Sequence, residues 1–405
     1  MKQERSLTLE SFVREVRFSP RAQPHSGNDD HNREIVLNCG TTRRTRQKPV
    51  TMDSLRSLSS VLLIEKDIYA DVLPVWSFPQ ISTEVQDVVV SRSGLQHETI
   101  PLQFTFSRFG NQWIYSFIDI RKEDSGLTDK VQAAQATVVT TDFNPERYNE
   151  LTKMMVHIYL STGSPLKVAE CYVSVFAKGS YNAGDSFGEF SAASHDARAA
   201  YLASSIKDVI RIFGEDIILI WAALIMKKRL IVVSQKLGLL QKICRALPVL
   251  VWHRQNWDIV RPYVNHSDNE ISDVQDSQVY IAGFIDESIR EREDLYDLLV
   301  DVNNRSVTVS SAAKGDFMMT GVHRGICEFL VTTAENAEST DADIIRGNST
   351  KIKDLLNKLE QLKVERDNGE PIVDYKALQE AGLPPNLDKF LYQLATAEGM
   401  TALTA

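Results

Sequence analysis

The sequence predicts an α+β module, then an α/β module, and finally a helical tail. Three observations support this order. After residue 57, short runs of alternating apolar residues are separated by turn signals, a pattern typical of antiparallel strands. Further along, short wholly apolar runs alternate with helical patterns, as in parallel sheets. Near the C-terminus, apolar residues recur at helical spacing. The predicted segments are 58–163, 164–310 and 311–405.

The first module is predicted to contain hairpins followed by a helix, and a second helix is predicted to open the next segment. Gly110-Asn111 lies between two alternating runs and is a strong turn signal. Asn144 followed by Pro145 predicts the start of a helix that ends near Gly163. Ser164-Pro165 repeats this signal for the next helix. The predicted strands cover residues 61–64, 72–78, 101–106, 113–117 and 136–140.

Within the second module, the Gly and Ser content of residues 179–195 predicts a surface loop or hinge, and the α/β pattern begins after it. Leu230 to Val233 are all apolar, which predicts a strand buried on both faces. The predicted helices are 197–213, 216–226 and 236–247, and the predicted strands are 279–285, 298–302 and 307–309. In the tail, Ile352, Leu355 and Leu359 belong to an amphipathic stripe, and a closing helix is expected over 387–397.

Residues 1–57 differ from the remainder in charge. They contain 11 Lys and Arg and 7 Asp and Glu, a net charge of +4, which leaves −13 for the rest of the chain. The segment is polar and has no sustained apolar periodicity, so we expect a disordered extension. Its acidic residues argue against a mitochondrial transit peptide. Met52, just before the first predicted strand, is an alternative start.

Composition argues against several classes of function. The net charge of −9 argues against broad nucleic-acid binding, which requires a cationic surface. The longest apolar run has ten residues, Ile217 to Met226, whereas a membrane-spanning helix needs about 20. The four cysteines lie far apart and no histidine stands at zinc-site spacing, so reduced thiols without a metal are expected. No P-loop, dinucleotide fingerprint, nucleophile elbow or H-E-x-x-H motif is present, so neither a cofactor nor covalent catalysis is predicted.

Two short segments are candidate partner-binding sites. Lys227, Lys228 and Arg229 stand at a helix-to-strand junction. They serve either as charges that complement the helix dipole or as a basic patch for an acidic partner or anionic lipid. The second segment contains Trp252, His253, Arg254 and Trp257. Tryptophan and arginine are enriched at interface hot spots, and aromatic residues are equally common in cores, so both interpretations stay open.

The order of several segments resembles the DENN module, which defines a family of Rab guanine nucleotide exchange factors. The resemblance covers roughly 58–405. It is carried by the combination of motifs, since none is diagnostic alone. Upstream the motifs are Leu63-Ile-Glu-Lys-Asp67, Val75-Trp76, Asp142-Phe-Asn-Pro-Glu146 and Gly163-Ser-Pro-Leu-Lys167. Centrally they are Ala199-Ala-Tyr-Leu202, Ser205-Ile-Lys-Asp208, Phe213-Gly214, Lys227 to Ser234, Arg245 to Trp257 and Tyr280 to Asp286, and downstream they are Asp294 to Asp297 and Phe390 to Glu398.

This resemblance implies a longin-like subdomain, a central α/β DENN subdomain and a helical C-terminal subdomain. It implies a cytoplasmic exchange factor that binds a Rab GTPase, is recruited to late endosomes through partners, and regulates endosomal trafficking. A compact member of the family is also linked to Commander, the coiled-coil endosomal cargo-retrieval complex. A non-catalytic scaffold subunit of that complex is therefore the alternative. A hydrolase assembled across the fold is a third reading, which would need a nucleophile beside a base.

Overall fold

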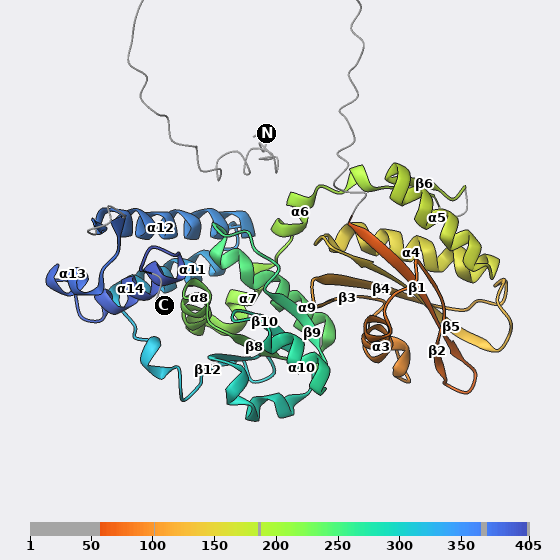
Figure 1. Ribbon diagram of the computed structural model, residues 1–405, viewed down its shortest axis with the longest axis horizontal. Coiled ribbons are helices and arrows are strands. Elements are labelled where there is room, and N and C mark those ends of the chain that lie inside the picture. The colour runs from red at the N-terminus through yellow and green to blue at the C-terminus, as the bar shows by residue number, and fades with distance from the viewer. Residues whose placement is uncertain (1–56, 101, 185–187, 366–370, 403–405) are drawn as a thin grey trace, which may run out of the picture. The chain divides into compact units, whose positions relative to one another are not determined.

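The structure is a computed structural model that describes residues 57–100, 102–184, 188–365 and 371–402. The extension predicted over 1–57 lies outside the described residues except for Ser57. The described chain contains two five-stranded sheets and a set of C-terminal helices (Figure 1). The described residues therefore confirm the coarse prediction of a fold built from sheets and helices.

The first sheet is antiparallel and has the strand order β2-β1-β5-β4-β3. Its strands are β1 (Leu58–Asp67), β2 (Val72–Phe78), β3 (Phe104–Phe109), β4 (Gln112–Ile120) and β5 (Val131–Thr140). Both predicted hairpins are present. The strand predicted to start at Pro101 begins at Phe104 instead, and the strand predicted over 136–140 is longer than expected.

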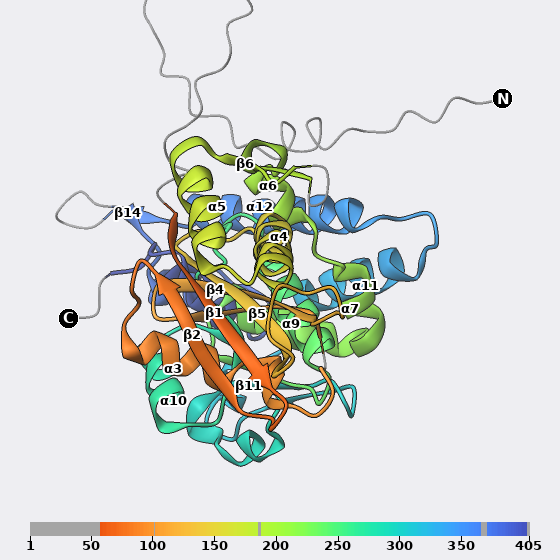
Figure 2. The same ribbon diagram turned by 90° about the vertical axis from the view of Figure 1, so that its right-hand side faces the viewer.

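Helices cover both faces of the first sheet. Helix α4 (Pro145–Thr162) packs on β4 and β5, and Asn144 caps it by accepting from the backbone N–H of Arg147, as predicted. Helix α3 (Thr83–Ser91), which the sequence reading missed, covers the opposite face through its valines. Helix α5 (Pro165–Lys178) follows the boundary predicted at residue 163 but packs against α4 and β1 (Figure 2).

The second sheet has the order β12-β11-β8-β10-β9, in which every neighbouring pair except β11–β12 is parallel. Its strands are β8 (Leu230–Val233), β9 (Val260–Val264), β10 (Ile281–Phe284), β11 (Leu298–Asp301) and β12 (Ser306–Val309). The prediction that 230–233 is buried on both faces is confirmed, because all four residues are inaccessible in the centre of the sheet. Strand β12 contains the predicted strand 307–309 and forms a partly exposed antiparallel edge.

The helices of the second module are α6 (Ala197–Leu202), α7 (Ile206–Phe213), α8 (Ile217–Ile225), α9 (Leu237–Ala246) and α10 (Asp268–Gln275). The prediction of a single helix over 197–213 was wrong, because two helices cover this segment. Ser205 has a φ of 56°, in the left-handed region, and this interrupts the helix between α6 and α7. The apolar residues of α7, Ile206, Val209, Ile210 and Phe213, are all buried. The segment 179–195 is only partly a loop, since it contains the short hairpin of β6 (Ser180–Asn182) and β7 (Glu189–Ser191).

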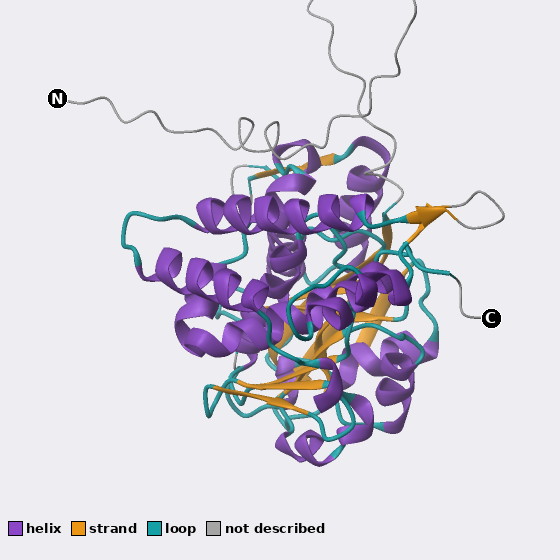
Figure 3. Ribbon diagram, turned by 90° about the vertical axis from the view of Figure 1, so that its left-hand side faces the viewer, coloured by secondary structure: helices purple, strands orange, loops and turns teal. Residues whose placement is uncertain are grey.

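The tail is helical, as predicted, with α11 (Gly321–Glu335), α12 (Asp341–Gln361), α13 (Tyr375–Glu380) and α14 (Leu387–Ala397) (Figure 3). It also contains the short pair β13 (Val364–Glu365) and β14 (Pro371–Ile372). On α12 the residues Ile352, Leu355 and Leu359 are buried, which agrees with the predicted stripe. Helix α11 contacts α7, α8 and α12, so the tail packs on the second module.

Candidate functional site at the junction of the two sheets

The two sheets adjoin at their edges, where β3 lies beside β9. Polar groups cross this junction without solvent between them. The side-chain amide of Gln241 donates to the carbonyl of Phe106 at 2.6 Å. The backbone N–H of Gly110 donates to the Asp273 carboxylate at 2.9 Å. Each contact joins a residue of the β3–β4 hairpin to a helix of the second module, so the two modules meet in a defined register.

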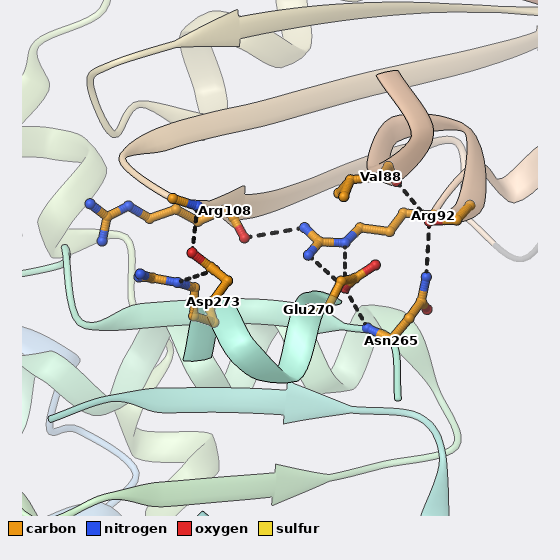
Figure 4. Close-up of polar contacts among 9 residues, drawn as sticks. Val88, Arg92, Arg108, Asn265, Glu270 and Asp273 are labelled. Atoms are coloured by element: carbon orange, nitrogen blue, oxygen red, sulfur yellow. Dashed lines mark hydrogen bonds and ion pairs between the residues drawn. The ribbon is translucent and has the colours of Figure 1, made fainter. Parts of the chain in front are cut away.

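A buried ion pair between Arg92 and Glu270 stands at the centre of this junction (Figure 4). Their side chains are only 5% and 3% exposed. The Nη2 and Nε atoms of Arg92 donate to Glu270 Oε2 at 2.7 and 3.1 Å. Nη1 donates to the carbonyl of Arg108 at 3.2 Å, and the backbone N–H of Asn265 donates to the same Oε2 atom of Glu270 at 2.7 Å. In the Arg92–Glu270 contact both the donor and the acceptor are charged, and such hydrogen bonds are strong and have a specific geometry.

A second charged cluster continues the junction along β3. Arg261 on β9 donates to Asp273 at 3.2 Å, and Arg108 on β3 lies 3.6 Å from Asp258. The Arg108 guanidinium also stacks over the ring of Trp113 at 5.7 Å. Burial, and then the nearby charge of Arg261, lower the pKa of Arg108 from its usual value.

Aromatic contacts close the opposite end of the junction. The Arg245 guanidinium forms an ion pair with Glu146 at 2.8 Å and lies over the ring of Phe143 at 5.6 Å. The ring of Tyr201 stacks on Phe143 at 5.7 Å and lies 4.6 Å from Trp257. A cavity of about 380 Å³ opens beside this group. It lies between β3, the start of α4 and the short segment that connects α6 to α7.

The predicted basic patch is used mainly within the chain. Lys228 forms an ion pair with Asp316 at 2.6 Å. Arg229 holds Asp297 through its backbone N–H at 2.9 Å and its Nη2 at 3.0 Å. The hydrogen bonds and charge of Asp297 raise the pKa of Arg229. Lys227 is exposed, so it is the member of this group whose side chain is available to a partner.

The tryptophan segment belongs to the interior. Trp252 and Trp257 are buried, and the indole N–H of Trp257 donates to the carbonyl of Arg245 at 3.1 Å. His253 lies 3.2 Å from Glu398, and Arg254 forms an ion pair with the same carboxylate. The core interpretation of this segment is therefore the one that the structure supports, and these four side chains do not form an exposed hot spot.

Glu398 has the most strongly perturbed carboxyl pKa in this part of the molecule. Burial alone would raise it, but the hydrogen bond from His253 and the charge of Arg254 outweigh burial and lower the pKa of Glu398 to about 2. Arg254 also donates to the carbonyls of Leu224 and Ile225 at 2.6 Å, which caps the end of α8. The network therefore fastens the C-terminal residues to the second module.

His266 lies close to both a serine and a carboxylate. Ser288 and Asp286 both approach Nδ1 of His266, at 2.9 and 3.3 Å, whereas a catalytic triad needs its serine and carboxylate on opposite ring nitrogens. The described part of the chain holds no cluster of three metal-ligating groups. It also contains no helix whose length and hydropathy suit a bilayer crossing.

The junction residues could not have been located from the sequence, because their partners lie far apart. Arg92 and Glu270 are 178 positions from each other, and each is an ordinary polar residue in its own segment. The Gly110-Asn111 turn signal predicted the hairpin, but it gave no indication that the Gly110 N–H contacts Asp273.

Comparison with known proteins identifies the family. The family model described as "SPA: Stabilization of polarity axis" matches residues 203–311, which lie mostly in the second module. DENN domain-containing protein 10 of Dictyostelium discoideum is 42% identical over 84% of this chain and 97% of its own length. The mouse protein of that name is 35% identical over 87% of this chain and 98% of its own length, and the human one is 34% identical over 84% and 95%. The chain therefore belongs to the family of DENN domain-containing protein 10.

Proposed function

We propose that this chain is a guanine nucleotide exchange factor for a Rab-family GTPase and acts by binding, without covalent catalysis. The observation that carries the proposal is the buried Arg92–Glu270 pair and the polar contacts around it. These contacts hold the first sheet and the second sheet in one arrangement, so a partner that touches both modules meets a single rigid surface.

An exchange factor needs no nucleophile or metal of its own. It accelerates nucleotide release by binding the open, nucleotide-free GTPase more tightly than the nucleotide-bound form. Moving a GTPase from almost entirely closed to almost entirely open takes a difference in affinity of about 5.5 kcal/mol. A preorganised surface favours such discrimination, because little of the binding free energy is then spent on ordering the exchange factor.

The site of action is proposed to be the late endosome, reached through protein partners. The runner-up function is a scaffold subunit of the coiled-coil endosomal retrieval complex, and the compact four-helix tail on the second module favours it. Both functions use binding alone, so the fold does not separate them.

A nucleotide-release panel tests the proposal. Purified full-length protein is mixed with Rab GTPases loaded with a fluorescent nucleotide, and the decrease in fluorescence is followed. We expect accelerated release from one Rab or a few related ones, and no effect on the others. No acceleration across the whole panel would contradict exchange activity and favour the scaffold function, which co-purification with a coiled-coil assembly would then support.

A further inference from the structure

A groove between the second module and the tail is separate from the sheet junction. It has a volume of about 840 Å³ and lies between the start of α8 and one face of α11, with residues 384–386 also lining it. Its lining follows α11 from Gly321 to Thr332. At 1.5 Å per residue this is a length of about 16 Å, or three helical turns.

The wall of the groove is apolar and partly open to solvent. Ile218 and Leu219 of α8 and Val331 of α11 line it, and Met319 remains 42% exposed. A neighbouring methionine, Met318, is 41% exposed. Methionine side chains are flexible and polarizable, and they adapt to the shape of an incoming apolar surface. An elongated apolar groove between two helices suits the apolar stripe of a third helix.

Acidic side chains surround this apolar wall. Glu215 and Asp216 stand at the start of α8, Glu328 stands on α11, and all three are exposed. Arg324 is the cation among the lining residues, so the groove has a net charge of −2. Within the described part of the chain, no ion pair neutralises any of these four groups. The Cys327 thiol of the same groove donates to the backbone carbonyl of Glu215 at 3.5 Å, so the start of α8 lies against α11 at this point.

We propose that this groove binds an amphipathic helix of about three turns that carries lysine or arginine on its flanks. Its apolar stripe would lie against Leu219 and Val331, and its cations would face Glu215, Asp216 and Glu328. Charge complementarity selects a basic helix over an acidic one, because an acidic helix would leave like charges opposed across a narrow gap. The inference does not depend on GTPase exchange, which is proposed for the other junction.

The test uses the full chain and a defined probe, the fluorescein-labelled peptide LKKLLKLLKKLLKL, with LEELLELLEELLEL as its acidic counterpart. Fluorescence anisotropy at low salt should show saturable binding of the basic peptide and none of the acidic one. The double variant Glu215→Lys/Glu328→Lys should weaken binding at least tenfold. Arg324→Glu should strengthen it severalfold, because it removes the one repelling cation of the lining.

A matched control separates the groove from the general acidity of the protein. Glu98→Lys/Glu291→Lys makes the same change in net charge at exposed positions outside the groove, and it should alter affinity less than threefold. All of these positions are exposed, so we expect the variants to fold, as circular dichroism will check. Equal weakening by the two double variants would overturn the proposal.

A second measurement locates the peptide. Alkylation of Cys327 by iodoacetamide is followed by peptide mapping, with and without saturating basic peptide. Burial and the carboxylates of Glu215 and Asp216 raise the pKa of this thiol, so the basal reaction is slow and is best followed at high pH. Bound peptide should slow it at least fivefold. Unchanged alkylation under saturating peptide would show that the helix binds elsewhere and would overturn the assignment of the groove.

Discussion

The two edges of the first sheet are treated in opposite ways. The β3 edge is covered by the second module, and the Arg92–Glu270 ion pair is buried at this junction. The β2 edge is the outer strand at the other side of the sheet and exposes apolar side chains. Leu73, Val75 and Phe78 are 57%, 42% and 40% exposed.

The difference shows that polarity alone does not decide which edge is buried. Arg92 is buried beside β3 because Glu270 of the second module pairs with it, and Arg108 of β3 lies 3.6 Å from Asp258, whereas β2 is the outer strand at the other side of the sheet. Free edges are commonly protected against pairing with other chains by proline and bulges, and β2 has both, since Pro74 lies at a register shift in the β1–β2 pair. Stability should therefore respond strongly to changes at the β3 junction and weakly to changes on β2.

The largest effect is expected for Glu270→Ala. This change leaves the Arg92 guanidinium buried without its partner, and breaking a buried pair typically costs about 3–5 kcal/mol. Urea denaturation should show this loss in the free energy of unfolding. A loss below about 1 kcal/mol would mean that the junction holds the modules together through other contacts.

A double substitution sharpens this result. Arg92→Met/Glu270→Leu removes both charges and keeps most of the volume, so it should restore much of the stability that Glu270→Ala loses. If the double variant is as unstable as the single one, packing at the junction, and not the unpaired charge, is the source of the loss.

The junction between the tail and the second module should give a pH-dependent effect. Because the pKa of Glu398 is lowered to about 2 from 4.5, its charged form stabilises the fold, fully so above about pH 4.5, and this stabilisation is lost as the pH falls toward 2. Between pH 6 and pH 3 the wild type should lose about 1–2 kcal/mol more than Glu398→Gln. Parallel stability curves for the two proteins would contradict this account of Glu398.

Charge reversal at the predicted basic patch should affect stability differently at Lys228 and at Lys227. Lys228→Glu opposes Asp316 and should cost about 1 kcal/mol, whereas the exposed Lys227→Glu should leave the melting temperature nearly unchanged. If Lys227→Glu weakens partner or membrane binding at unchanged stability, that side chain is part of an interface. A large loss of stability from Lys227→Glu would show that this side chain also serves the fold.

The smallest effect on stability is expected at the free edge. Leu73→Ser replaces a side chain that is already exposed and should change the free energy of unfolding by no more than about 0.5 kcal/mol. The same substitution should increase solubility, measured by light scattering against concentration. Destabilisation comparable to that of Glu270→Ala would remove the contrast between the two edges.

Most of the fold was predictable from local patterns. Asn144-Pro145 marked the start of α4, and the wholly apolar run 230–233 marked the central parallel strand. Strand β9 was not predicted because Arg261 and Pro262 interrupt its apolar run. Arg261 is nevertheless buried, since it forms an ion pair with Asp273. The break at Ser205 was missed because its left-handed backbone has no marker such as glycine.

The candidate site was much less predictable than the fold. The sequence is compatible with either an interface or a core role for Trp252 and Trp257, which are buried, because both environments favour aromatic side chains. Arg92 and Glu270 carried no local signal at all, since their pairing depends on how two modules meet. Local sequence determines helices and strands, whereas a junction of this kind is set by contacts between distant segments.

The central claim is that the joined modules discriminate between conformers of a GTPase. The most direct measurement is the equilibrium affinity of the full chain for one Rab in its nucleotide-free and GDP-bound forms, by biolayer interferometry. The account predicts at least 10³-fold tighter binding of the nucleotide-free form, or about 4 kcal/mol. Equal affinity for the two forms, for every Rab that binds, would contradict it.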